Sequence, residues 1–204
     1  MTTEQFWDER YGQSDRIWSG EPNAALVREV AGLTPGTALE LGCGEGGDAI
    51  WLAGQGWRVT ASDISRIALA RAAEHAEAQG VADRIDWQRH DLAATFPAGR
   101  YDLVTAGFLY SPELPRTEIL RTAAEAVTPG GTLLILGHGP WPDWHQGPRP
   151  DIELPTPDEL LADLALPGWQ VLTCSEHERT QTGPDGQTLV RIDNTLKLRR
   201  PTIA

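Results

Sequence analysis

The sequence has few cysteines and no long apolar segment. Only two of its 204 residues are cysteine, too few for a disulfide framework, so a reducing, cytoplasmic location is expected. No apolar run approaches the length of a membrane span. The first residues also lack a basic region followed by an apolar stretch. We therefore expect neither membrane attachment nor a secretory signal.

Basic residues are scarce as well. Seventeen Lys and Arg stand against 29 Asp and Glu, which gives a net charge of −12, and Lys197 is the only lysine. A nucleic-acid partner needs a basic surface, so this balance argues against DNA or RNA. The expected partner is a small molecule. Composition is compatible with a monomer or a homodimer.

Strand-like and helix-like segments alternate along the chain. This order predicts βαβ units, in which helices cover a mostly parallel sheet within one α/β domain. Two extended segments at 169–178 and 187–198, joined through Pro184-Asp185-Gly186, predict a closing antiparallel hairpin. The other expected strands lie at 37–41, 58–62, 84–90, 101–106 and 132–136, and the expected helices include 3–11, 22–32, 116–127 and 156–166.

A glycine-rich loop joins the first expected strand to the next helix. It contains Gly42, Gly44 and Gly46, with Glu40 two places before the first glycine. Asp63 ends the next apolar run, about twenty residues further on. An open α/β sheet builds nucleotide sites from such a strand, glycine turn and helix, and an acid at that distance can accept hydrogen bonds from ribose hydroxyls.

The choice of ligand depends on Glu40. Gly42, Gly44 and Gly47 also satisfy the dinucleotide fingerprint, but a carboxylate at Glu40 would repel a pyrophosphate at the start of the helix. S-adenosylmethionine has no phosphate, and its ammonium and sulfonium groups tolerate or favour nearby acid. The spacing of Glu40 and the three glycines in fact resembles the first motif of the class I S-adenosylmethionine-dependent methyltransferases.

This resemblance covers nearly the whole chain, from Phe6 to Arg199. It implies a doubly wound, mostly parallel seven-stranded sheet with a C-terminal antiparallel hairpin, the Rossmann-like methyltransferase fold. The aromatic residues Trp7, Tyr11 and Trp18 are similar to those of the small-molecule, thiopurine and tellurite-resistance branch, in which an N-terminal lid covers the cofactor. The single domain would then comprise a helical lid at 1–33 and a Rossmann-like core at 34–204.

The resemblance also implies cofactor contacts beyond the loop. Asp63 would bind the ribose and Ile64 the adenine face, although Ile64 could equally be a core residue. Asp91 and the Leu92 amide would meet the adenine edge, the alternative for Asp91 being a turn cap. Phe108 is as readily core as contact. The complete expected set is Glu40, Gly42, Cys43, Gly44, Gly46, Asp63, Ile64, Asp91, Leu92, Gly107, Phe108 and Trp18.

Methyl transfer from a sulfonium is an in-line displacement with an already activated donor, so positioning can supply much of the rate enhancement. A base is needed only for a protonated acceptor. His138, just after the last expected parallel strand, is the best-placed candidate, its alternative role being a structural loop hydrogen bond. No ligand spacing favours a metal. A nicotinamide-dependent reductase and a non-catalytic S-adenosylmethionine-binding protein remain the alternative functions.

Overall fold

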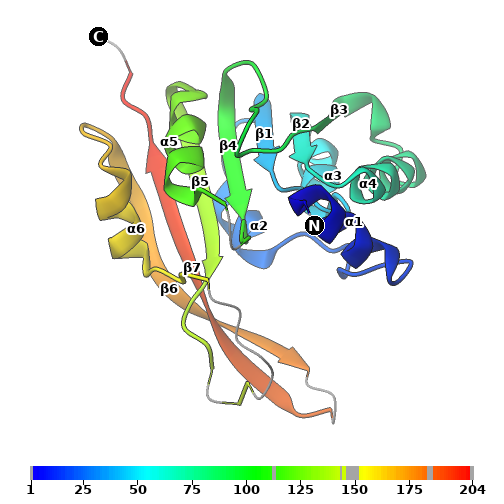
Figure 1. Ribbon diagram of the computed structural model, residues 1–204. Coiled ribbons are helices and arrows are strands. Elements are labelled where there is room, and N and C mark those ends of the chain that lie inside the picture. The colour runs from blue at the N-terminus through cyan, green and yellow to red at the C-terminus, as the bar shows by residue number, and fades with distance from the viewer. Residues whose placement is uncertain (1, 112–113, 143, 146–151, 183–185, 203–204) are drawn as a thin grey trace.

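The protein is built on one seven-stranded sheet. The computed structural model describes residues 2–111, 114–142, 144–145, 152–182 and 186–202. The strand order is β3-β2-β1-β4-β5-β7-β6, in which β7 runs antiparallel to both neighbours and the other pairings are parallel (Figure 1). The predicted mostly parallel sheet with a closing hairpin is thus confirmed. The strands are β1 (Thr37–Leu41), β2 (Arg58–Asp63), β3 (Ile85–Arg89), β4 (Tyr101–Gly107), β5 (Val127–His138), β6 (Gln170–Thr182) and β7 (Thr188–Arg199).

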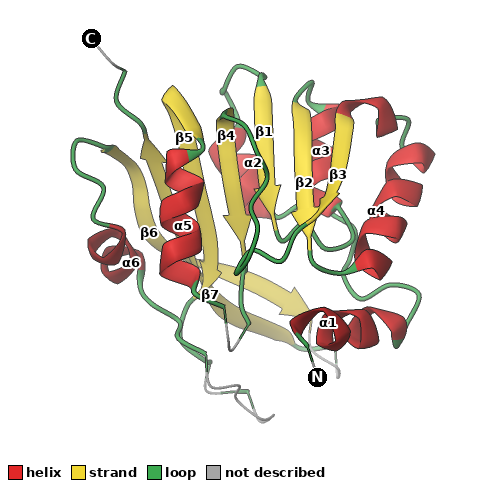
Figure 2. Ribbon diagram, turned by 45° about the horizontal axis from the view of Figure 1, so that its top comes forward, coloured by secondary structure: helices red, strands yellow, loops and turns green. Residues whose placement is uncertain are grey.

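Helices cover both faces of this sheet. One apolar cluster joins α2, α3 and α4 to one face, and a second cluster joins α5 and α6 to the other (Figure 2). Strand β5 serves both clusters, because Leu133 packs on one side and Leu134 on the other, as its continuous apolar sequence predicts. The helices are α1 (Thr3–Gly12), α2 (Ala24–Val30), α3 (Gly47–Gly54), α4 (Arg66–Ala78), α5 (Arg116–Glu125) and α6 (Pro157–Leu164), with a 3₁₀ turn at Ala82–Arg84.

Side-chain caps fix where several helices begin. Ser65 caps α4 by accepting a hydrogen bond from the Ala68 amide. Thr156 forms a capping box with Glu159 at the start of α6. Helix α2 differs from its prediction and begins at Ala24 rather than at residue 22, because the Asn23 side chain caps it.

Strand β5 is longer than predicted. It begins at Val127 and runs through Pro129-Gly130-Gly131, a segment that was expected to separate helix from strand. A register shift against β4, between the pairs at Tyr101 and Leu103, accommodates the extra residues, and Gly130 has a φ of +80°. In the hairpin turn, Pro184 and Asp185 lie outside the described residues.

The carboxyl ends of the parallel strands share one edge of the sheet. Helix α1 lies against this edge, and the β6–β7 hairpin extends beyond it at the bottom of Figure 1. In an open α/β sheet this is the edge at which ligands bind. No helix among the described residues is long and apolar enough to cross a membrane.

Candidate functional site

The glycine loop after β1 has a backbone that favours glycine. Gly42, Gly44 and Gly46 have φ values of +71°, +53° and +84°, in the left-handed region. A Cβ on Gly44 would lie 2.9 Å from the Tyr11 hydroxyl, and one on Gly42 would lie 2.8 Å from Leu109 Cδ1. The loop is therefore closely covered by side chains from α1 and from the segment after β4.

Gly46 has a different environment from the two earlier glycines. A Cβ there would lie 2.8 Å from the Trp87 ring and 2.9 Å from the Ala72 Cβ. Gly46 thus lets the start of α3 pack against α4 and β3. Its missing side chain makes room for packing in the protein interior.

Three carboxyl groups lie beneath the loop. Glu40 from β1 and Asp63 from the end of β2 are buried, and Asp48 from the first turn of α3 is half-buried. Burial, followed by repulsion from Asp48 and Asp63, raises the pKa of Glu40 well above its ordinary value. The Oε2 atom of Glu40 is buried without a hydrogen-bond partner. Such a group favours a cationic hydrogen-bond donor.

Asp63 ties the loop to the end of β2. Its Oδ2 accepts a hydrogen bond from the Gly44 amide and its Oδ1 accepts one from the Ser65 amide, both at 2.9 Å. Burial raises the pKa of Asp63 despite these two bonds, which act in the opposite direction. The carboxylate predicted to hold a ribose therefore also organises the turn around it.

The N-terminal segment, residues 2–33, reaches over this loop. Tyr11 is buried, whereas Trp18 is 48% exposed, and the Trp18 indole donates a hydrogen bond of 3.1 Å to the Tyr11 hydroxyl. Burial raises the pKa of Tyr11, so the phenol stays protonated. Two of the three predicted aromatic residues, Tyr11 and Trp18, are thus brought against Gly44, and Trp7 contacts the Tyr11 ring.

Glu45 holds the segment in place and was not identified from the sequence. Its carboxylate accepts hydrogen bonds from the Ile17 and Trp18 amides and pairs with Arg71, each at 3.0 Å. Burial acts to raise the pKa of Glu45, but the Trp18 amide and Arg71 outweigh it and lower that pKa. In the sequence Glu45 is one unassigned letter between two motif glycines, so only the fold reveals the contact.

Four other predicted residues occupy mixed surroundings. Cys43 is buried in the loop, and Ile64 is partly buried directly after Asp63. Asp91 is exposed and accepts a hydrogen bond from the Ala93 amide, which is the turn-capping arrangement. Leu92 packs against the core cluster on the α5 side of the sheet.

The end of β4 is strained. Phe108 has a φ of +51°, which is uncommon for a residue other than glycine and is frequent at functional sites. Its ring lies 4.5 Å from the His138 ring, centroid to centroid. A Cβ on the preceding Gly107 would lie 3.9 Å from Asp48 Oδ2, so β4 ends directly above the acidic cluster.

His138, at the end of β5, has an acidic partner that was not predicted. Its Nδ1 lies 2.9 Å from Asp193 Oδ1, while Asp193 Oδ2 accepts a hydrogen bond from Arg179 Nε. The two residues face each other in the register of β5 and β7. Because the pairing joins residues 55 apart in the chain, sequence spacing alone did not reveal it.

Electrostatics define the protonation of this pair. Burial acts to raise the pKa of Asp193, but His138 and Arg179 outweigh it and lower that pKa, so the carboxylate is ionised. Burial lowers the pKa of His138, although Asp193 opposes the shift. A neutral His138 then donates from Nδ1 to Asp193 and keeps an unprotonated Nε2. Within the described residues, no group of three or more His, Cys, Asp and Glu side chains is placed to hold a metal ion.

Comparison with known proteins identifies the part of the chain that contains this loop. Residues 38–131, from β1 to the middle of β5, match the family model described as a methyltransferase domain. These residues are a methyltransferase domain. The match to this family model supports the predicted family and its cofactor, S-adenosylmethionine, independently of the glycine motif.

Relatives extend the likeness of the methyltransferase domain to the rest of the chain. A solved structure from work on the conversion of a disulfide bond into a thioacetal group during echinomycin biosynthesis is 28% identical, with a TM-score of 0.75, and the match covers 99% of this chain and 94% of that one. Thiocyanate methyltransferase 1 of Arabidopsis thaliana is 27% identical over 80% of this chain and 72% of its own length.

Another relative shares less of its length. Ribosomal RNA small subunit methyltransferase C of Alcanivorax borkumensis is 31% identical over an aligned region that covers 61% of this chain and 40% of that protein. The chain thus spans less than half of the first curated relatives that it matches. What these proteins share with it is the methyltransferase domain.

The Glu45 contacts make a testable prediction about the N-terminal segment. In Glu45→Gln we expect faster amide hydrogen exchange at Ile17 and Trp18, because a neutral side chain loses charge-assisted bonds worth about 1.5–3 kcal/mol. In the parent protein, the stabilisation by this carboxylate is complete above the ordinary glutamate pKa of 4.5 and is lost as pH falls through the lowered folded-state pKa.

The control for this measurement is Glu77→Gln, which removes an exposed carboxylate from the same helix that carries Arg71. It should leave the exchange of both amides unchanged. Equal exchange in Glu45→Gln and the parent protein at pH 7 would contradict the role given to Glu45.

Proposed function

We propose that the protein transfers the methyl group of S-adenosylmethionine to a small-molecule acceptor. The observation that carries this proposal is the unpaired, buried Oε2 of Glu40 among the carboxylates of Asp48 and Asp63. An excess of buried negative charge under a glycine turn fits a ligand with an ammonium group and no phosphate. It does not fit the pyrophosphate of a nicotinamide dinucleotide, which would meet like charge there.

The residues present fit each part of the cofactor. The ammonium would pair with Glu40 beside Gly42, and the ribose hydroxyls would bind Asp63 next to the Gly44 amide. Trp18 and Tyr11, already packed on Gly44, would cover the ligand and place aromatic surface near its sulfonium. Ile64 follows β2, and Asp91 and Leu92 follow β3, so these three residues would border the adenine. Cys43 and Gly46 complete the glycine loop. Gly107 and Phe108, at the end of β4, would border the methionine part of the cofactor.

The charge balance supports a small acceptor over a nucleic acid. A net charge of −12 leaves little basic surface for a polyanion, although one relative is a ribosomal RNA methyltransferase by name. Thiocyanate methyltransferase 1, matched over most of both chains, fits a small acceptor better by its name. We also assign the protein to the cytoplasm, with no membrane or nucleic-acid partner, as a monomer or a homodimer.

Bound S-adenosylmethionine supplies a methyl carbon already activated by its bond to a positively charged sulfur, to which the electrons of that bond return on transfer. The protein residues then position the acceptor and accept its proton. His138 is neutral, oriented by Asp193 through Nδ1, and stands between the rings of Phe108 and Tyr110. A hydroxyl or thiol acceptor placed at Nε2 would lose its proton to this atom as its lone pair forms the new bond to carbon.

Calorimetric titration tests the cofactor directly. We expect S-adenosylhomocysteine to bind with micromolar affinity, and NADH and NADPH not to bind, because only the former lacks a pyrophosphate. Saturable binding of a nicotinamide dinucleotide alone would make the protein a reductase. Binding of none of the three would contradict the proposed use of S-adenosylmethionine.

Glu40→Gln should separate cofactor binding from stability. The affinity for S-adenosylhomocysteine should fall by about 1.5–3 kcal/mol, because the ammonium loses a charge-assisted bond. The unliganded variant should melt at a higher temperature than the parent protein. A buried acid with a raised pKa destabilises the fold as pH rises above its ordinary value of 4.5, and the amide removes that penalty.

The gain in melting temperature should therefore grow between pH 5 and pH 8, at about 2–4 °C for each kcal/mol. Glu118→Gln, an exposed glutamate on α5, is the matched control and should change neither property. Unchanged affinity in Glu40→Gln would refute the role of this carboxylate.

A further prediction concerns the proposed base, His138. With a phenol as acceptor, His138→Asn should lower kcat by about 10²–10⁴-fold, the usual contribution of a general base. In the parent enzyme, the rate should fall as pH drops below the lowered pKa of His138 and stay level above 6.5, its ordinary value. His90→Asn removes a histidine whose ring, among the described residues, contacts the Thr95 and Gln88 side chains, and it should keep full activity. An unchanged pH profile in His138→Asn would remove His138 from this role.

A further inference from the structure

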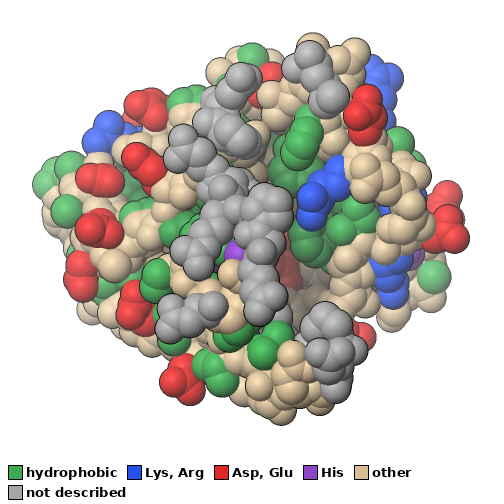
Figure 3. Space-filling view, turned by 60° about the horizontal axis from the view of Figure 1, so that its bottom comes forward, with side chains coloured by type: hydrophobic (Ala, Val, Ile, Leu, Met, Phe, Trp, Pro, Cys, Tyr) green, Lys and Arg blue, Asp and Glu red, His purple; other side chains and the backbone are tan. Residues whose placement is uncertain are grey.

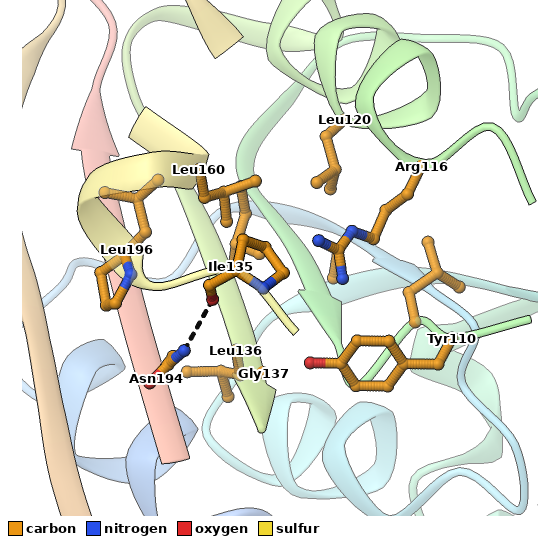
Figure 4. A pocket seen from close by; sticks show the side chains of 13 residues that line it. Tyr110, Arg116, Leu120, Ile135, Leu136, Gly137, Leu160, Asn194 and Leu196 are labelled. Carbon is orange, nitrogen blue, oxygen red and sulfur yellow. Dashed lines mark hydrogen bonds between the residues drawn. The ribbon is translucent and has the colours of Figure 1, made fainter. Parts of the chain in front are cut away.

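Two neighbouring hollows open at the end of β4, outside the cofactor loop. The outer one is a cavity of about 300 Å³, and the inner one is a recess of about 20 Å³ between α5, α6 and the sheet (Figure 4). They share Leu109, Tyr110 and Arg116 as lining residues. Because Leu109 also contacts Gly42, the cavity adjoins the loop from the acceptor side.

The cavity has a cation without a charged partner. Arg116 lies at the first residue of α5, with its guanidinium 5.4 Å from the centroid of the Tyr110 ring, and Figure 4 shows both side chains at the mouth of the inner recess. Within the part of the chain that the structure describes, the guanidinium donates a hydrogen bond of 3.3 Å to the backbone carbonyl of Glu153 and none to the Glu153 carboxylate. Among the described residues, Arg116 forms no ion pair.

A second arginine near Tyr110, Arg191, forms no ion pair among the described residues, and its guanidinium lies 5.4 Å from the centroid of the Trp141 ring. Arg191 is directly opposite Arg179 in the β6–β7 pairing, and like charges in that position repel. Both oxygens of Asp193 already serve Arg179 and His138, and Arg191 Nε is buried without a partner. Burial, opposed by Asp193 and assisted by Arg179, lowers the pKa of Arg191.

The inner recess is polar at one point. Asn194 donates to the carbonyl of Pro155 at 2.8 Å, as the dashed line in Figure 4 shows, but its Oδ1 is buried and has no partner. The remaining wall is largely aliphatic, with Leu120, Leu160 and Leu196. Few convergent polar groups in an otherwise apolar hollow are characteristic of a small-molecule site.

From these observations we infer that the cavity at Tyr110 and Arg116 binds the methyl acceptor and selects one that bears an anionic group. The inference rests on the proposed methyl transfer and adds the substrate class to it. In a protein of charge −12, two arginines without carboxylate partners beside one tyrosine form a local positive field, and the guanidinium fork of Arg116 suits a carboxylate. The view onto the carboxyl ends of the strands shows a hollow with hydrophobic and basic side chains at its rim and acidic side-chain atoms at its base (Figure 3).

The position of the cavity explains how one acceptor could reach both Arg116 and the proposed base, His138. Tyr110 accepts a hydrogen bond of 2.7 Å from the His138 amide, and its ring stacks on the His138 ring. An acceptor whose anionic group binds Arg116 would therefore extend along Tyr110 toward the proposed base, His138. Its nucleophile would face His138, on the same side as Phe108 and the end of β4.

A binding experiment with matched probes tests the inference. Protein saturated with S-adenosylhomocysteine is titrated calorimetrically with 4-mercaptobenzoate and with 4-mercaptobenzamide, which has the same shape without the charge. We expect the carboxylate to bind at least tenfold more tightly. Arg116→Gln should remove this preference while leaving the affinity for the amide within about twofold. Arg116→Lys should retain part of it, because the charge stays and the planar fork is lost.

Arg58→Gln provides the control, because Arg58 is exposed at the amino end of β2, on the opposite edge of the sheet. It should keep the full preference. Equal affinities for the two probes, failure of both to bind, or an unchanged ratio in Arg116→Gln would each overturn the inference. Failure of S-adenosylhomocysteine itself to bind would instead refute the proposed function, so the two failures are distinguishable.

Discussion

The arrangement of the whole edge depends on three crowded carboxyl groups at the ends of β1 and β2 and the start of α3. Glu40 and Asp63 are buried and Asp48 is half-buried, and among the described residues no basic side chain pairs with Glu40. The left-handed loop lies over these carboxylates, with the Gly44 amide donating to Asp63. Such a site gives up stability in the unliganded protein, and a cationic ligand would restore it.

Around this acidic centre, the charges are separated in space. Among the described residues, Arg116 and Arg191 form no ion pair and lie on the other side of β4, near Tyr110, whereas Glu40 and Asp63 lie at the ends of β1 and β2. A cationic donor and an anionic acceptor would each be attracted to its own part of the edge. Phe108, with its left-handed backbone, stands between the two parts. This separation of charge would place the donor and the acceptor on opposite sides of the end of β4.

Much of this architecture follows from the sequence because it depends on local patterns. The glycine turn after β1 and the helix that Thr156 caps depend on interactions within a few residues, and both lie where they were predicted. The start of β5 was predicted wrongly, because proline and glycines usually interrupt a strand and here a register shift against β4 accommodates them. In that case tertiary pairing outweighed local preference.

The parts of the site that were missed join distant segments. Glu45 meets the N-terminal segment 27 residues away, and Asp193 meets His138 only because β7 pairs antiparallel with β5. No spacing rule links such positions. Their residue types were visible in the sequence, but their partners depend on strand order and register.

The place of β7 in the strand order has a consequence for how the chain matures. The last strand of the sheet is inserted between β5 and β6, and its Leu196 and Leu198 are buried in the core. Until residues 188–199 have left the ribosome, β5 therefore has an open edge of consecutive apolar residues, the kind of edge that pairs with other chains. The sheet can therefore close only after the β6–β7 hairpin has been synthesised, and rapid docking of this hairpin protects the open edge of β5 from aggregation.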